Sequence, residues 1–87
     1  MENILNITET YDTPGIIFDS PKNIFEISGR SLPENTKEFY APVMQWLSEY
    51  VKKPNKETLF TFKLDYLNSS STRKIIEMIF LLQNIKP

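Results

Sequence analysis

Residues 58–72 read TLFTFKLDYLNSSST, and this stretch carries the two signals on which the fold prediction depends. Apolar and polar side chains alternate over residues 58–67, which is the pattern of a β-strand with one buried face. Asn68 and four consecutive hydroxyl side chains (residues 69–72) follow, and an apolar segment of helical spacing then runs to about Asn84. The stretch therefore predicts a strand that passes directly into a helix. The strand residues expected to share one face are Phe60, Phe62, Leu64 and Tyr66.

The segments before this stretch predict a β-hairpin and a first helix. Two short apolar runs, residues 16–18 and 24–28, flank the turn-forming sequence of residues 19–23. A helix is expected from roughly Glu34 to Lys52, with Asn35 or Thr36 as its N-cap. Pro42 predicts a kink, or a helix start just before it, because proline cannot donate the helical hydrogen bond. The helix residues expected on the buried face are Phe39, Val43, Trp46, Leu47 and Tyr50.

The order strand, strand, helix, strand, helix indicates an α/β (α+β) fold. We expect a small mixed sheet with an N-terminal hairpin, a parallel crossover through the first helix, and helices packed mainly on one face. The 87 residues are enough for one domain, residues 1–87.

Composition excludes several classes of function. The chain has neither cysteine nor histidine, so disulfides, thiolate zinc sites and histidine-based acid–base catalysis are excluded within it. The net charge is −1 and no basic stripe is visible, which disfavours a nucleic-acid partner. The N-terminal sequence does not resemble a signal peptide, and the longest apolar run is too short to span a bilayer. We therefore expect a cytoplasmic protein with no cofactor, no metal and no membrane insertion.

The hydroxyl cluster after Asn68 has two interpretations. It can be only a helix N-cap, in which Asn68 or Ser69 satisfies a free backbone N–H. It can also be an acceptor site for a phosphoryl group, because the partial positive charge at a helix N-terminus favours an anion. A single cap needs one polar side chain, so four hydroxyls exceed that need. The residues alone leave both interpretations open.

The other candidate sites and classes of function have less support in the sequence. The polar loop that includes Arg30, Pro33, Glu34 and Asn35 either holds a partner or only connects a strand to a helix. A serine hydrolase is a third class of function, but the chain offers no histidine and no obviously placed Lys or Asp as the base. A structural or assembly subunit with a plain helix cap is the remaining alternative.

Several motifs resemble the SiaC family of bacterial regulatory phosphoproteins, from about Thr8 to Leu82. The Pro-Glu-Asn element together with the Tyr-Leu-Asn-Ser-Ser-Ser element makes the resemblance specific. The motifs are Thr13-Pro14, Gly29-Arg30-Ser31-x-Pro33-Glu34-Asn35, Phe39-Tyr40-x-Pro42-Val43-x-x-Trp46-Leu47 and Leu64-x-Tyr66-Leu67-Asn68-Ser69-Ser70-Ser71.

The resemblance implies a fold similar to the STAS-type anti-sigma factor antagonists and a function without catalysis. Members of the family are substrates of a Ser/Thr kinase and a PP2C-type phosphatase. The unphosphorylated form binds and activates a diguanylate cyclase, which raises cyclic di-GMP and promotes biofilm growth; other client proteins are possible. The family also implies a C-terminal segment beyond the point that matches Pro87, so this chain is expected to lack it.

The resemblance also assigns site residues. The phosphoacceptor is the first hydroxyl after Asn68, which is Ser69, with Ser70 and Ser71 as alternatives. Asn68 and Ser70 are expected to shape the junction and to contact partners. The loop residues expected on the same partner-binding surface are Arg30, Pro33, Glu34 and Asn35.

Overall fold

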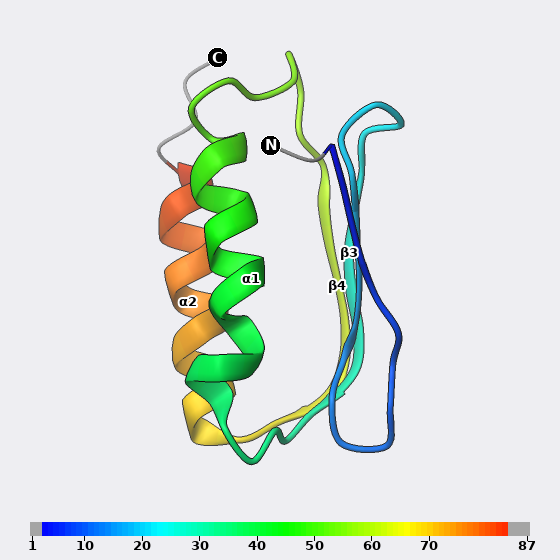
Figure 1. The fold of residues 1–87 in the computed structure, drawn as a ribbon, viewed down its shortest axis with the longest axis vertical. Coiled ribbons are helices and arrows are strands. Elements are labelled where there is room, and N and C mark those ends of the chain that lie inside the picture. Colours follow the sequence, from blue (N-terminus) through cyan, green and yellow to red (C-terminus); the bar gives the residue numbers. More distant parts are fainter. Residues whose placement is uncertain (1–2, 84–87) are drawn as a thin grey trace.

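The computed structural model describes residues 3–83, which form a four-stranded sheet and two helices (Figure 1). The sheet order follows the sequence, β1-β2-β3-β4. The strands are β1 (Ile4–Ile7), β2 (Gly15–Asp19), β3 (Ile24–Ser31) and β4 (Phe60–Leu67). The helices are α1 (Thr36–Tyr50) and α2 (Ser69–Gln83), which lie side by side on one face of the sheet and begin at the same end of the molecule (Figure 1).

The predicted fold class is confirmed. Strands β2 and β3 form the expected antiparallel hairpin, and β3 and β4 pair in parallel through the crossover that contains α1. The sequence pattern did not predict β1, which is only four residues long. It pairs antiparallel with β2, where Leu5 lies opposite Phe18.

Helix α1 begins at Thr36, and Asn35 is its N-cap, since the Asn35 side chain accepts a hydrogen bond from the Glu38 amide. Pro42 lies inside the helix, so the predicted start just before Pro42 is wrong. The buried face differs from the expectation at one position: Tyr40 is fully buried, and Phe39 is only partly buried.

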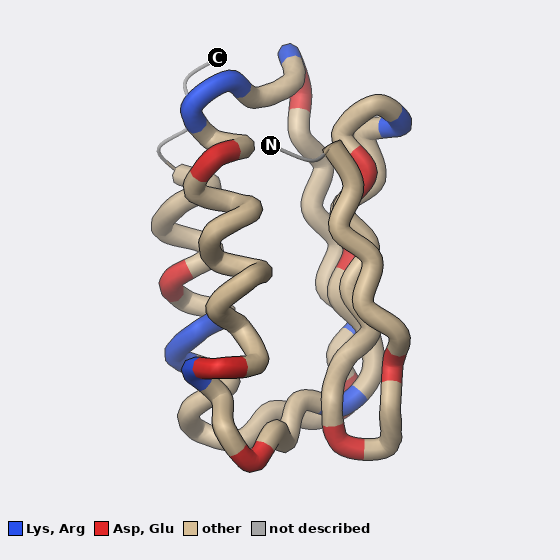
Figure 2. Tube along the Cα trace, in the orientation of Figure 1, with Lys and Arg blue, Asp and Glu red and all other residues tan. Residues whose placement is uncertain are grey.

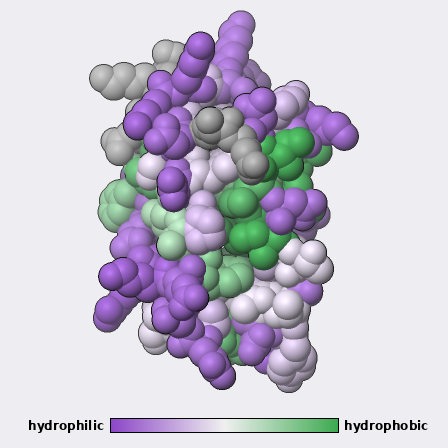
Figure 3. All heavy atoms as spheres, in the orientation of Figure 1, coloured by the Kyte–Doolittle hydropathy of each residue, from purple (hydrophilic) through white to green (hydrophobic). Residues whose placement is uncertain are grey.

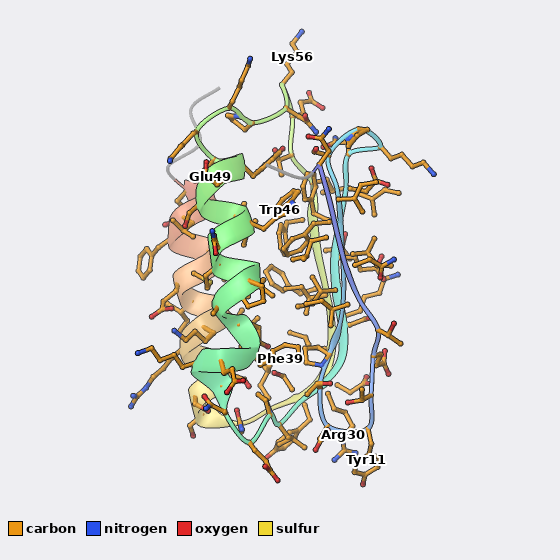
Figure 4. The ribbon with its side chains drawn as sticks, viewed as in Figure 1. Tyr11, Arg30, Phe39, Trp46, Glu49 and Lys56 are labelled. Carbon is orange, nitrogen blue, oxygen red and sulfur yellow. The ribbon has the colours of Figure 1, made fainter. Side chains whose placement is uncertain are left out.

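The core is rich in aromatic residues and lies between the sheet and the helices (Figure 4). The Trp46 ring lies 5.2 Å from Phe18 and stacks 5.4 Å from Tyr50, while Phe25 lies 4.9 Å from Tyr50. Aromatic side chains each bury a large area, so a few of them can hold a small domain together. In the view of Figure 3, hydrophobic side chains gather where α1 meets the sheet, and hydrophilic ones cover the ends.

An irregularity in β4 changes which residues reach the core. The pairing passes from Gly29 opposite Leu64 to Arg30 opposite Tyr66, which leaves Asp65 as an extra residue. Such a β-bulge shifts the alternation of side chains by one position. Leu67 therefore packs against the core, whereas Tyr66 is 54% exposed. The prediction that Tyr66 shares the buried face of the strand is wrong for this reason.

Candidate functional site at a strand-to-helix junction

Asn68 connects β4 to α2 and caps the helix. Its backbone N–H donates to the carbonyl of Ser31 at 3.1 Å, which continues the contact between the ends of β3 and β4. Its side-chain oxygen Oδ1 accepts a hydrogen bond from the Ser71 amide at 2.9 Å, as an N-cap residue does. The cap is thus provided by the carboxamide, and the serine hydroxyls that follow are not required for it.

Ser71 belongs to a buried chain of hydroxyl groups. Its hydroxyl donates to the Ser31 carbonyl at 3.1 Å and accepts from the Ser31 hydroxyl at 2.7 Å. The Tyr40 hydroxyl lies 2.6 Å from the hydroxyl oxygen of Ser31. Ser31, Ser71 and Tyr40 are all fully buried. The chain of hydrogen bonds therefore fixes the start of α2 to both β3 and α1.

Burial raises the pKa of the Tyr40 hydroxyl above its ordinary value, because the phenolate would lose its hydration. Hydrogen bonds from Ser31 and Ser71 act in the opposite direction and lower the pKa, but the effect of burial is larger. Tyr40 is therefore neutral at physiological pH, and its role at the junction is that of a hydrogen-bonding anchor.

Ser70 connects the starts of the two helices. Its hydroxyl lies 2.7 Å from the Thr36 hydroxyl and donates to Asn68 Oδ1 at 3.3 Å. Thr36 is the first residue of α1, just as Ser69 is the first residue of α2. The two N-termini, with their partial positive charges, are therefore neighbours. The sequence offered one signal for this pairing, since an Asn followed by a hydroxyl residue begins each helix.

Ser69 differs from its neighbours in both exposure and hydrogen bonding. Its side chain is exposed, and its hydroxyl has no hydrogen-bond partner within residues 3–83. Thr72 is also exposed, but its hydroxyl donates to the Asn68 carbonyl at 3.1 Å. Among the four consecutive hydroxyl groups, Ser69 is thus the one that is open to solvent and not engaged elsewhere in the described part of the chain.

The predicted loop residues divide between different environments. Pro33 is buried, Glu34 is exposed, and Asn35 caps α1 beside the junction. Arg30 alternates with the buried Gly29 and Ser31, so its side chain points to the sheet face away from the helices. There its guanidinium lies 4.9 Å from the centre of the Tyr11 ring (Figure 4). A single partner would have to reach around the edge of the sheet to contact both Arg30 and Ser69.

Charged residues are scattered over the fold, as Figure 2 shows. No group of three or more acidic side chains that could hold a metal ion occurs within residues 3–83. Neither of the two described helices is long and apolar enough to cross a membrane.

Solved structures share this fold over most of its length. SiaC of Pseudomonas aeruginosa matches with a TM-score of 0.88 and 27% identity, covering 97% of this chain and 69% of SiaC. The structure of the diguanylate cyclase SiaD in complex with its activator SiaC, from the same organism, matches with a TM-score of 0.86 and 28% identity over 93% of this chain and 66% of the matched chain. An uncharacterized protein of P. aeruginosa strain UCBPP-PA14 is 29% identical over 79 residues. This chain spans 63% of the length of that relative.

The fold is that of a class of small regulatory proteins. A family model described as "SiaC family regulatory phosphoprotein" matches residues 7–87. The chain belongs to this family, as its motifs predicted.

Proposed function

We propose that this chain is a regulator whose binding to a client protein is controlled by reversible phosphorylation of Ser69. The observation that carries the proposal is the state of the Ser69 hydroxyl, which is exposed and has no hydrogen-bond partner within residues 3–83. A kinase can reach this hydroxyl without unfolding the junction. Ser70 is held by Thr36 and Asn68, and Ser71 is buried, so transfer to either would require hydrogen bonds to break.

The physical effect of the modification follows from its position. A phosphoryl group adds about −1.5 to −2 charges at neutral pH. At the first residue of a helix this charge faces the positive end of the helix dipole, so the helix is not expected to unfold. The surface at the junction becomes negatively charged instead, and a partner that binds the unphosphorylated form is lost. Asn68 and Ser70 define the shape of this surface, and Glu34 and Asn35 lie at the neighbouring helix start.

The proposed partners are a Ser/Thr kinase, a PP2C-type phosphatase and a client of the diguanylate cyclase class, all in the cytoplasm. The SiaC structure in complex with SiaD supports the choice of client, since SiaC is the activator in that complex. In the proposal, the unphosphorylated chain binds the cyclase and raises cyclic di-GMP, and the kinase reverses this effect.

The modification is tested by incubating the chain with its cognate kinase and ATP and mapping the phosphate by mass spectrometry. We expect modification at Ser69, loss of it in Ser69→Ala, and retention of it in Ser70→Ala. A Ser69→Asp variant is expected to bind the cyclase more weakly than Ser69→Ala. Modification confined to another residue, or equal cyclase binding by these two variants, would contradict the proposal.

A further inference from the structure

One face of α2 carries large apolar side chains that the rest of residues 3–83 leaves partly exposed. Ile76 is 47% exposed and Phe80 is 63% exposed. Ser69, Arg73, Ile76 and Phe80 follow one another at four- and three-residue steps, so they lie within about 60° of one another around a helix with 100° per residue. We call these four residues the α2 outer face. The buried residues of α2 (Ser71, Ile75 and Met78) lie on the opposite side.

Arg73 is the charged residue of the α2 outer face, and it has no ion-pair partner within the described residues. Glu77 stands four positions further along the helix, where it could pair with Arg73. Its carboxylate instead lies 3.2 Å from Lys74 Nζ. Arg73 is exposed. A guanidinium that lies one helical turn from the exposed Ile76 and has no ion-paired carboxylate matches a partner that brings one.

An open groove of about 350 Å³ extends the α2 outer face toward α1. It is lined by Phe80 and Leu81 together with Glu77, Met44 and Ser48, so both helices contribute to it. The two helices run side by side over this region (Figure 1). The groove and the face together offer apolar side chains from both helices, against which the apolar side of a partner helix can pack.

We propose that the α2 outer face binds an amphipathic helix of a protein partner, which sets apolar side chains against Ile76 and Phe80 and a carboxylate against Arg73. We also propose that a phosphoryl group on Ser69 draws Arg73 away from that carboxylate; this second part rests on the proposed function. Ser69 and Arg73 are four positions apart, so a phosphate and a guanidinium on them are neighbours on the helix surface. Phosphorylation then places negative charge at the end of the face and removes its one positive charge in the same event.

The pairing of Arg73 with the phosphate is tested without a partner. Phosphoserine is incorporated at position 69 by genetic code expansion, so no kinase is needed. The second phosphate pKa is then followed by phosphorus NMR. We expect this pKa to be lower by about 0.3 in the otherwise unchanged chain than in Arg73→Gln, since a nearby cation favours the doubly charged phosphate. Arg30→Gln removes the same charge from the opposite sheet face and should leave the value unchanged. Equal pKa values in all three proteins would overturn the pairing.

Docking is tested by calorimetry with the SiaD-type diguanylate cyclase of the source organism. Ile76→Ser and Phe80→Ser should each weaken binding by about tenfold or more. Ile17→Ser is the matched control, because Ile17 is 43% exposed on the sheet, in comparison with 47% for Ile76. Arg73→Gln should weaken binding more than Arg73→Lys, which keeps the charge.

The outcomes separate this inference from the proposed function. If the cyclase binds and phosphoserine weakens the binding, but Ile76→Ser and Phe80→Ser behave like Ile17→Ser, the docking surface is overturned and the phosphorylation switch stands. If the cyclase does not bind the unmodified chain, the client assignment fails, and docking to a cyclase fails with it. Sedimentation velocity adds one more outcome: self-association that Phe80→Ser abolishes would assign the face to a second copy and overturn the proposal.

Discussion

Replacing Ser69, Ser70 and Ser71 by alanine, one at a time, measures how much each hydroxyl contributes to the free energy of unfolding. Alanine has a higher helix propensity than serine by up to about 0.5 kcal/mol, so each replacement gains a little in the helix itself. The losses differ. The Ser69 hydroxyl has no hydrogen-bond partner among the described residues, the Ser70 hydroxyl has an exposed bond to Thr36, and the Ser71 hydroxyl has two bonds to the buried Ser31.

Two buried hydrogen bonds at about 1 kcal/mol each, less the gain in propensity, predict that Ser71→Ala lowers the free energy of unfolding by about 1.5 kcal/mol. The Ser31 carbonyl keeps its bond from the Asn68 amide, and the Ser31 hydroxyl keeps Tyr40, so neither group is left without a partner. Ser70→Ala should change stability by less than about 0.5 kcal/mol, and Ser69→Ala should be neutral or slightly stabilising.

Urea denaturation followed by tryptophan fluorescence measures these differences, since Trp46 lies in the core. In a domain of this size, 1.5 kcal/mol corresponds to a fall in Tm of about 6–12 °C. If Ser71→Ala unfolds at the same urea concentration as Ser69→Ala, the buried hydroxyl chain does not stabilise the junction.

Three further predictions concern the backbone, the cap and pH. Gly29→Ala should lower the free energy of unfolding by about 1–2 kcal/mol, measured by urea denaturation. The reason is that Gly29 has φ +95° and an added Cβ would lie 2.7 Å from the Glu9 carboxyl carbon. Asn68→Ala should lower the free energy of unfolding by about 1 kcal/mol through loss of the cap. Asn68→Asp keeps the acceptor oxygen and should lower it by less in the same assay. The raised pKa of Tyr40 means that the folded state keeps a proton that the unfolded state loses near pH 10; the associated stability is present below that pH and is lost as the pH rises further. The decrease in Tm from about pH 8 to about pH 11 should therefore be smaller in Tyr40→Phe than in the unchanged chain. An equal decrease in both proteins would contradict the raised pKa of Tyr40.

Local sequence patterns determined much of the architecture. The alternation over residues 58–67 predicted β4, and the hydroxyl run after Asn68 correctly marked the start of α2. The parallel pairing of β3 with β4 followed from the helix between them. These features are available from the chain because each depends on residues that are close in sequence. The same is true of the Asn68 cap, whose acceptor and donor are three residues apart.

Other features depend on contacts between distant segments and were decided by the tertiary structure. The bulge at Asp65 exposes Tyr66, and it exists only in the pairing with β3. The three serines after Asn68 are equivalent in the sequence and become different through partners elsewhere: Ser71 meets Ser31, forty residues away, and Ser70 meets Thr36. Ser69 is exposed, and its hydroxyl bonds to neither Ser31 nor Thr36. The sequence by itself thus determined where the hydroxyl cluster lies and which family it marks, whereas packing against β3 and α1 decided which hydroxyl stays accessible, because burial is a property of the assembled fold.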